Sequence, residues 1–239
     1  MSDPTRVPAV DAAVKDPHAA APSDPDWLDP GLGPVDYVFG YGSLIQDRSR
    51  GFTLDVVGLA HPVRVTGLRR AWNVHGPGPG FSTTFLGVTR EESAACNGVL
   101  APVYPNEWRD LDARERNYRR VEIDPAAIGW LTPTRPPVGD GVRVWAYEAE
   151  SPAEPNDRLP IIQSYIDICL DGCLAIDERL GTGEAFAREF VATTDGWSRH
   201  WVNDRQFPRA PFRTVPRAGA IDRLLAERCP EPFAAIRIE

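Results

Sequence analysis

Residues 38–45, VFGYGSLI, change within a few positions from an apolar run to two glycines and a serine. Gly40 and Gly42 tolerate backbone conformations that other residues avoid, and they let a ligand approach the main chain closely. Successive backbone N–H groups in such a turn can converge on a carboxylate or an oxyanion. The segment lacks the third glycine of a dinucleotide-binding fingerprint and the Lys-Ser or Lys-Thr pair of a phosphate-binding loop. We expect either an anion-binding turn for a small acid or a plain structural turn.

A single carboxylate, Glu115, is the candidate for acid–base chemistry. It lies in LDARERNYRR, residues 111–120, four positions after Leu111. On a helix these two residues share a face, so a core-facing Leu111 directs Glu115 inward as well. Burial raises the pKa of such a carboxyl group toward the range of a general base. The competing interpretation is a solvated helix face that carries charges of alternating sign.

The histidines and cysteines form no recognisable catalytic or metal-binding pattern. His61, His75 and His200 have no evident partner, and the four cysteines include no C-x-x-C pair. Such a pair is the usual spacing of a zinc site. Cys169 and Cys173, one helical turn apart, are expected to be small buried residues of a helix. The sequence therefore predicts no metal site.

The overall charge disfavours some classes of function. The 239 residues carry a formal net charge of −8, whereas a nucleic-acid binder needs a concentrated basic face to neutralise phosphates. No apolar run approaches the ~20 residues that span a bilayer, and the N-terminus lacks a basic segment followed by an apolar core. We expect a cytoplasmic protein that acts on a small molecule and binds neither nucleic acid nor membrane. The oligomeric state has no signal in the sequence.

The first half of the chain predicts a leader followed by short strands. Residues 1–34 are rich in Pro, Ala and Asp and lack apolar periodicity, which is typical of a disordered leader. The glycine- and proline-rich residues 75–80 predict a loop, and the polar residues 90–97 a turn. Strand-forming residues recur around these breaks, at 37–45, 54–74, 85–89 and 98–103.

The rest of the chain changes from strands to helices. A helix is predicted at 106–118, and strands follow at 121–123 and 142–147. Beyond residue 155, apolar residues spaced by three and four predict helices at 161–174, 181–194 and 220–228, with a Pro-rich surface connection at 208–216. Strands that precede helices, with one helix among the strands, are typical of an α+β fold. We expect residues 35–239 to form a single domain, with a core at 36–150 and a mainly helical extension at 155–239.

Three motifs follow one another along the chain: YGSL at 41–44, CNGV at 96–99 and L-D-x-x-E-x-x-Y at 111–118. Together they resemble the γ-glutamylcyclotransferase superfamily, which includes ChaC-type, AIG2-like and BtrG-like proteins. The match covers roughly residues 36–150. The resemblance implies a small mixed β-barrel with flanking helices. It also implies an enzyme, a transferase or lyase such as those of glutathione metabolism, that converts a γ-glutamyl amide to 5-oxoproline and a free amine without metal or cofactor.

The resemblance also implies roles for individual residues. Glu115 corresponds to the catalytic glutamate of the family, and one carboxylate between two nitrogens can move a proton from the attacking α-amine to the leaving amine. Tyr118 and Tyr147 are expected in the substrate pocket, with burial as half-polar core residues as the alternative. The substrate-holding loop of the family corresponds to Tyr41, Gly42, Ser43 and Leu44.

Residues 193–209, dense in Trp, Arg and Asp, have no counterpart that we can match in the short members of this family. They either line the leaving-group side of a pocket or pack Trp197 and Trp201 on the barrel. The leaving amine stays open among glutathione, a γ-glutamyl dipeptide, a γ-glutamylamine and a pathway intermediate. The alternative to an enzyme is a non-catalytic module of the same fold that binds a γ-glutamyl or amino-acid ligand.

Overall fold

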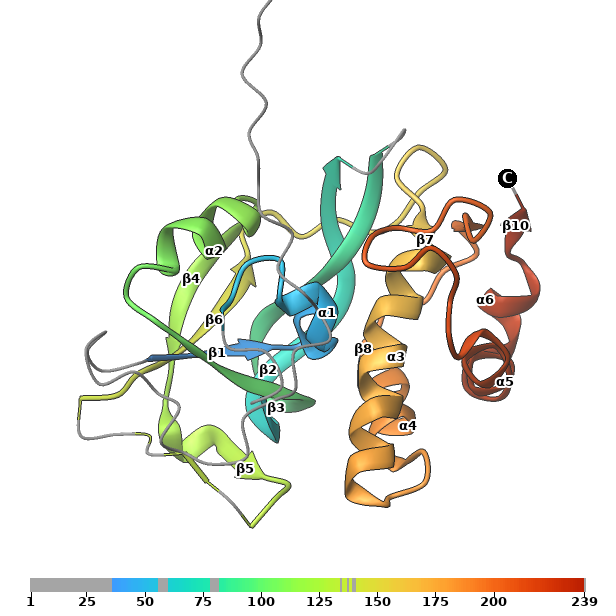
Figure 1. Ribbon diagram of the computed structural model, residues 1–239. Coiled ribbons are helices and arrows are strands. Elements are labelled where there is room, and N and C mark those ends of the chain that lie inside the picture. Colours follow the sequence, from blue (N-terminus) through green and yellow to red (C-terminus); the bar gives the residue numbers. More distant parts are fainter. Residues whose placement is uncertain are drawn as a thin grey trace, which may run out of the picture.

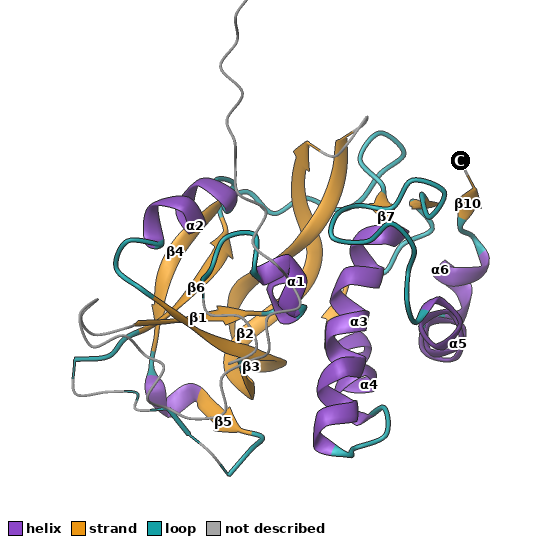
Figure 2. Ribbon diagram, in the orientation of Figure 1, coloured by secondary structure: helices purple, strands orange, loops and turns teal. Residues whose placement is uncertain are grey.

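The computed structural model describes residues 36–55, 60–77, 82–133, 135, 136, 138 and 141–238 (Figure 1). The predicted leader at 1–34 lies outside these residues. Figure 2 shows most of the strands gathered on one side of the molecule and helices α3 to α6 on the other. The fold class is therefore α+β, as the order of the predicted elements indicates.

A mixed seven-stranded sheet forms the strand side, in the order β4-β6-β1-β3-β2-β5, with β8 paired to β2. Strand β6 runs parallel to β1 and also meets β3 at Glu148 and Val88, so the sheet curls into a half-barrel. Its strands are β1 (Asp36–Gly40), β2 (His61–Pro77), β3 (Ser82–Val103), β4 (Tyr118–Ile123), β5 (Ile128–Trp130), β6 (Val144–Ala149) and β8 (Thr194–Asp195).

The hairpin of β2 and β3 corrects the prediction of several short strands. β3 continues for 22 residues through the expected turn at 90–97. The register passes from Thr66 opposite Ala95 to Leu68 opposite Arg90, so the polar residues 91–94 bulge opposite a single glycine, Gly67, whose φ is 81°. A bulge accommodates extra residues without ending the ladder. The predicted loop at 75–80 is also partly wrong, because β2 extends to residue 77; residues 78–80 lie outside the described residues.

Short helices connect the strands. The predicted helix at 106–118 is shorter than expected, because it ends before residue 115 and β4 begins at residue 118. The short helices are η3 (Ser43–Ile45), α1 (Asp47–Arg50), α2 (Trp108–Arg114) and η4 (Pro125–Ala127).

Most of the chain after residue 155 forms the helical side, as the apolar spacing there predicts, although β8 joins the large sheet. The helices are α3 (Gln163–Leu180), α4 (Ala185–Ala192), α5 (Ala218–Arg228) and α6 (Pro230–Ala234). A small sheet in the order β10-β9-β7 accompanies them. It consists of β7 (Ile161–Ile162), β9 (Trp201–Asn203) and β10 (Arg237–Ile238). The first two residues of the predicted helix at 161–174 therefore pair as a strand with β9 instead.

Helix α3 packs against the loop that follows β1. A Cβ atom on Gly172 would lie 2.7 Å from the Gln46 backbone nitrogen, so only glycine permits this approach. Cys169 and Cys173 are fully buried on α3, as predicted, and Phe186 and Phe190 of α4 face the core. The helical side therefore fixes the position of η3 from behind.

The Trp- and Arg-rich residues 193–209 mostly pack on the body of the protein. Trp201 is fully buried, and the Trp197 ring lies between the rings of Trp72 and Trp201 at centroid distances of 5.3 and 5.4 Å. Asp204 accepts hydrogen bonds from the Ser164 N–H at 2.7 Å and the Ser164 hydroxyl at 2.6 Å. Of the two interpretations of this segment, packing holds for both tryptophans.

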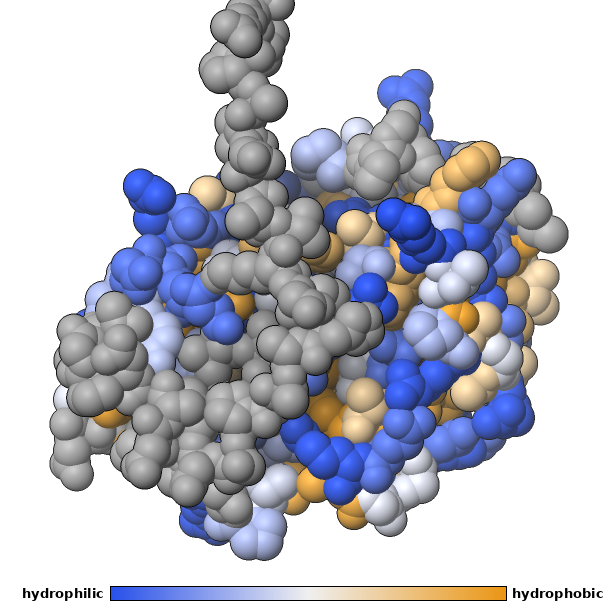
Figure 3. Space-filling model, in the orientation of Figure 1, coloured by the Kyte–Doolittle hydropathy of each residue, from blue (hydrophilic) through white to orange (hydrophobic). Residues whose placement is uncertain are grey.

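Polar and charged side chains cover most of the visible surface outside the grey residues, with hydrophobic side chains in small groups between them (Figure 3). The connection at 208–216 is less exposed than predicted, because Phe212 is buried. Among the described helices, none has the length and apolar character needed to cross a membrane.

Candidate functional site

The loop after β1 owes its shape to close packing of its two glycines. A Cβ atom on Gly40 would lie 2.7 Å from the Leu44 Cβ, and one on Gly42 would lie 2.9 Å from the Tyr165 hydroxyl. Gly42 has a φ of −136°, and Gly40 is not among the glycines with positive φ. Neither glycine therefore has the left-handed conformation that favours this residue. Glycine is required here because a side chain has no space.

The same loop presents unused hydrogen-bond donors. Within the described part of the chain, the backbone N–H groups of Gly42, Ser43 and Leu44 meet no acceptor. The next N–H, from Ile45, donates to the Gly42 carbonyl at 3.0 Å and closes the turn of η3. Successive open N–H groups at the start of a turn are suited to bind an oxyanion or a carboxylate.

A narrow cavity borders this loop, with about 30 Å³ of space for a water-sized sphere. That space holds one or two water molecules, so a larger ligand enters only when side chains at the mouth move. All seven site residues expected from the sequence line it. The complete lining consists of Phe39, Tyr41, Gly42, Ser43, Leu44, Leu86, Glu115, Tyr118, Tyr147 and Tyr165.

Glu115 follows the last residue of α2, where its N–H donates to the Leu111 carbonyl at 3.0 Å. Leu111 is fully buried, and the shared face directs Glu115 into the cavity, where its side chain keeps 16% of its surface exposed. Burial raises the pKa of the Glu115 carboxyl group, and the neighbouring Arg114 charge opposes this shift only in part. The carboxyl group therefore holds its proton more tightly than an exposed glutamate does, which favours a role in proton exchange.

Arg114 ties α2 to the glycine loop. One of its Nη atoms donates to the Ser49 carbonyl at 2.9 Å, and the other donates to the Ser43 hydroxyl at 3.1 Å. Its Nε lies 3.3 Å from Glu115 Oε1. The sequence places Arg114 beside Glu115 but does not reveal these contacts, because Ser43 is far away along the chain.

Two predicted pocket tyrosines line the cavity, and their hydroxyl groups already donate hydrogen bonds within the protein. The Tyr118 hydroxyl donates to the Leu86 carbonyl at 2.7 Å, and the Tyr147 hydroxyl donates to Asp112 Oδ1 at 2.6 Å. The spacing suggested that Tyr118 lies one helical turn beyond Glu115. In the structure, Tyr118 is instead the first residue of strand β4. Both residues combine the two expected roles, because each packs as a half-polar residue of the core and also lines the cavity.

The remaining wall contains Tyr41 and a residue that sequence reasoning missed, Tyr165. The Tyr41 hydroxyl donates to the Tyr147 carbonyl at 2.5 Å. Tyr165 belongs to α3, and its ring lies 5.0 Å from the Phe85 ring, centroid to centroid. A lone tyrosine among the aliphatic residues of 161–174 was the available signal, because a buried hydroxyl needs a polar neighbour.

The charge of Glu115 affects every tyrosine that lines the cavity. Burial raises the pKa of each of the four tyrosines that line the cavity, and the negative charge of Glu115 raises each pKa further. All four phenols therefore stay protonated at neutral pH, and Glu115 is the one carboxyl group among the residues that line the cavity.

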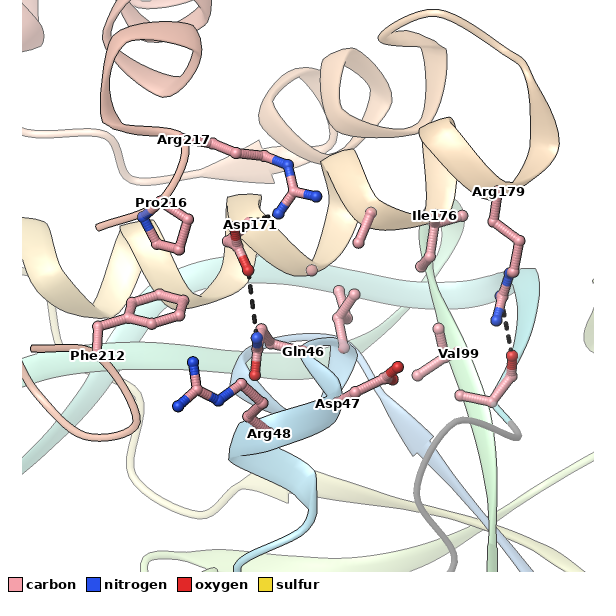
Figure 4. A pocket seen from close by; sticks show the side chains of 14 residues that line it. Gln46, Asp47, Arg48, Val99, Asp171, Ile176, Arg179, Phe212, Pro216 and Arg217 are labelled. Atoms are coloured by element: carbon pink, nitrogen blue, oxygen red, sulfur yellow. Dashed lines mark hydrogen bonds and ion pairs between the residues drawn. The ribbon is translucent and has the colours of Figure 1, made fainter. Parts of the chain in front are cut away.

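A larger cleft lies behind the loop, between α1, α3 and residues 212–217 (Figure 4). Asp171 accepts hydrogen bonds there from Gln46 Nε2 at 3.2 Å and from Arg217 Nη1 at 2.5 Å. None of the seven expected site residues lines this cleft. All seven line the smaller cavity instead, where burial raises the pKa of Glu115, so that cavity is the better candidate for proton transfer.

The cysteines and the described histidines lie outside the cavity. His200 differs from expectation, because its Nδ1 lies 3.0 Å from Asp157 Oδ1. The four cysteines are buried free thiols. No group of three or more His, Cys, Asp or Glu side chains in the described ranges is placed to hold a metal ion.

No family model and no curated protein matches the sequence. Solved structures do match. One titled gamma-glutamyl cyclotransferase aligns at 11% identity with a TM-score of 0.49, covering 80% of this chain and 99% of its own. An uncharacterised human protein aligns at 12% identity with a TM-score of 0.48, covering 78% and 98%. A yeast γ-glutamyl cyclotransferase described as specific to glutathione aligns at 12% identity with a TM-score of 0.38, covering 67% and 97%. The solved structures that this chain resembles thus include members of the family predicted from its motifs.

Proposed function

We propose that this protein is a γ-glutamylcyclotransferase-like enzyme that converts a γ-glutamyl amide or peptide to 5-oxoproline and a free amine. One observation carries the proposal. A single buried carboxyl group with a raised pKa, that of Glu115, lines the same cavity as a glycine loop with open backbone N–H groups. These are the two components that the reaction requires, a proton carrier and an oxyanion cradle.

The glycine loop is the expected binding site for the γ-glutamyl end of the substrate. The open N–H groups of Gly42, Ser43 and Leu44 are suited to stabilise the negative charge that develops on the γ-carbonyl oxygen. Holding the substrate folded on itself brings its α-amine to the γ-carbonyl carbon, which replaces an encounter between two molecules by ring closure within one.

Glu115 is expected to carry the proton. The α-amine attacks the γ-carbonyl carbon, and this attack forms the ring C–N bond. The attacking nitrogen loses a proton to the Glu115 carboxylate. The protonated Glu115 then donates that proton to the leaving nitrogen as the original amide C–N bond breaks. The raised pKa of Glu115 suits both halves of this exchange.

A binding module of the same fold is the rival function. Such a module has no need for an inward carboxylate, and burial of a charged group costs stability. The raised pKa of Glu115 signals this cost, because the fold disfavours the ionised form. Retention of an unfavourable charge at the centre of a cavity supports catalysis over binding alone.

The direct test of the proposed function is the fate of the substrate nitrogen. The protein would be incubated with glutathione, γ-glutamyl dipeptides and γ-glutamylamines that carry ¹⁵N at the α-position, and the products identified by mass spectrometry. Cyclotransfer yields 5-oxoproline with ¹⁵N in the ring, whereas simple hydrolysis yields labelled glutamate. Neither product from any compound, together with ligand-dependent thermal shifts, would favour the binding module instead.

Two glycine substitutions separate the cavity from the fold. A Cβ at Gly42 meets the Tyr165 hydroxyl and intrudes on the cavity, whereas a Cβ at Gly40 meets the Leu44 Cβ at 2.7 Å and the Leu44 carbonyl carbon at 3.3 Å. Overpacking costs ~1–3 kcal/mol. We expect Gly42→Ala to weaken binding of a γ-glutamyl ligand ~10-fold or more, an effect of ~1.4 kcal/mol. Gly40→Ala is expected to lower Tm more than Gly42→Ala does.

Titration calorimetry beside thermal melts measures both effects for the two variants. The reverse order, with Gly42→Ala the less stable protein and with unchanged ligand affinity, would contradict the assignment of Gly42 to the binding loop.

A further inference from the structure

Arg209 is a cation at the edge of the candidate site. It lies in the connection between β9 and α5, and its Nη1 is buried without a hydrogen-bond partner. Within the described residues it takes part in no ion pair. Its guanidinium lies 4.9 Å from the Phe85 ring centroid and 5.8 Å from the Tyr165 ring centroid. A buried guanidinium nitrogen with no acceptor is unfavourable in itself, which points to a ligand as its partner.

The position of Arg209 relates it to the cavity through Tyr165. Tyr165 lines the cavity, and its hydroxyl is the atom that a Cβ on Gly42 would meet at 2.9 Å. Arg209 itself is not part of the cavity lining. Its guanidinium therefore lies beyond the Tyr165 ring, outside the space that holds the γ-glutamyl end.

No acid of the described residues pairs with the Arg209 guanidinium. The charge of Asp204 acts on Arg209, but the Asp204 carboxylate accepts its hydrogen bonds from the N–H and hydroxyl groups of Ser164. Arg114, the other cation, is paired with Glu115. With Asp204 and Glu115 ionised, these four groups carry no net charge, but no carboxylate of the described residues contacts the Arg209 guanidinium, and a carboxylate of the substrate would supply that contact.

We propose that Arg209 binds a carboxylate on the leaving amine, so that the preferred substrates are γ-glutamyl amino acids and not γ-glutamylamines or γ-glutamyl polyamines. This inference rests on the proposed function. In a γ-glutamyl amino acid, a single carbon separates the scissile nitrogen from the second carboxylate, which therefore emerges beside the cavity. Arginine is suited to this role because its planar fork pairs with a carboxylate through two parallel hydrogen bonds.

A matched pair of substrates tests the proposal. γ-Glutamyl-alanine and γ-glutamyl-alaninamide differ only in the terminal carboxylate, and kcat/KM for 5-oxoproline release would be measured for both. We expect the wild-type protein to prefer the acid by ~10 to 100-fold, the range of a hydrogen bond to a charged group. Arg209→Met is expected to abolish this preference through a loss on the acid, whereas Arg209→Lys retains part of it.

Arg213→Met is the control, because it removes the same charge from an exposed position of the same connection. It should leave the preference intact. An unchanged preference in Arg209→Met would overturn the proposal. An equal loss on both substrates would also overturn it, since Arg209 would then serve the γ-glutamyl half or the fold.

Calorimetry distinguishes failure of this inference from failure of the proposed function. If the wild-type protein forms no 5-oxoproline, the proposed function fails, but binding of the two compounds still decides the role of Arg209. If the wild-type protein binds the acid more tightly than the amide and Arg209→Met removes this difference, the result would support a carboxylate site at Arg209. Equal binding of acid and amide by the wild-type protein would overturn the inference.

Discussion

Glu115→Gln is expected to lower the rate of 5-oxoproline formation by at least ~100-fold, the usual effect of losing a positioned acid–base group. Glutamine keeps the size and polarity of the side chain but cannot accept the proton of the α-amine. The substrate should still bind, because the open N–H groups of the glycine loop are unchanged. Turnover assays beside calorimetric titration measure the two effects separately.

The same substitution should make the protein more stable at neutral pH. Because burial raises the pKa of Glu115, the folded protein holds this proton more tightly than the unfolded chain. Stability of the wild-type protein therefore falls as the pH rises from the ordinary value of 4.5 through the raised pKa. Glu115→Gln escapes this loss. We expect its Tm to exceed that of the wild type at pH 7 and the difference to vanish at pH 4.5 and below.

Asp110→Asn is the matched control, because Asp110 lies on the same helix with 63% of its side chain exposed. It makes the same change of charge outside the cavity and should leave turnover nearly unchanged. Wild-type turnover should also fall in acid as Glu115 becomes protonated, at a pH above 4.5. Near wild-type activity in Glu115→Gln would remove Glu115 from the mechanism.

Local sequence patterns predict the parts of this site that depend on neighbouring residues. The turn after β1 follows from an apolar run interrupted by glycines, and the inward direction of Glu115 follows from its spacing to Leu111. Both are properties of one short segment. The α+β class likewise follows from the order of segments, as strands precede helices in the chain.

Contacts between distant segments were not predictable in this way. Tyr165 lies in a helix whose apolar spacing is explained by packing alone, and nothing local brings its hydroxyl to Gly42. Arg114 and Arg209 depend on Ser43 and Phe85, respectively, which are remote from them in the sequence. The long β2–β3 hairpin was misread because polar residues 91–94 are typical of a turn, whereas pairing with β2 on both sides of them keeps the ladder intact.

Arg70 provides the largest expected effect on stability. It is fully buried, and its guanidinium donates to groups from three separate parts of the chain. The Asn97 carbonyl accepts at 2.6 Å, the Phe190 carbonyl at 2.8 Å and the Tyr41 carbonyl at 3.3 Å. Among the described residues no carboxylate pairs with it, so backbone and side-chain oxygens, together with the Phe190 ring, stabilise the charge.

Arg70→Met should therefore destabilise the fold by ~3–5 kcal/mol, the cost of removing one partner from a buried charged network. Methionine fills much of the space but leaves several buried oxygens without a donor. For a chain of this size the expected drop in Tm is roughly 10 °C. Arg70→Lys should recover only part of the loss, because an ammonium group cannot reach acceptors in the plane of a guanidinium fork.

The neighbouring Arg69→Met is a stringent control for this prediction. Arg69 lies next to Arg70 on the same strand, but its side chain is 48% exposed and pairs with Asp195 at the surface. Such a pair contributes ~0–1 kcal/mol, so the two substitutions should differ several-fold in the free energy of unfolding. Similar denaturation midpoints for both variants would contradict the prediction. A large difference would support the buried network of Arg70, in which the Tyr41 carbonyl at the start of the glycine loop is one of the acceptors.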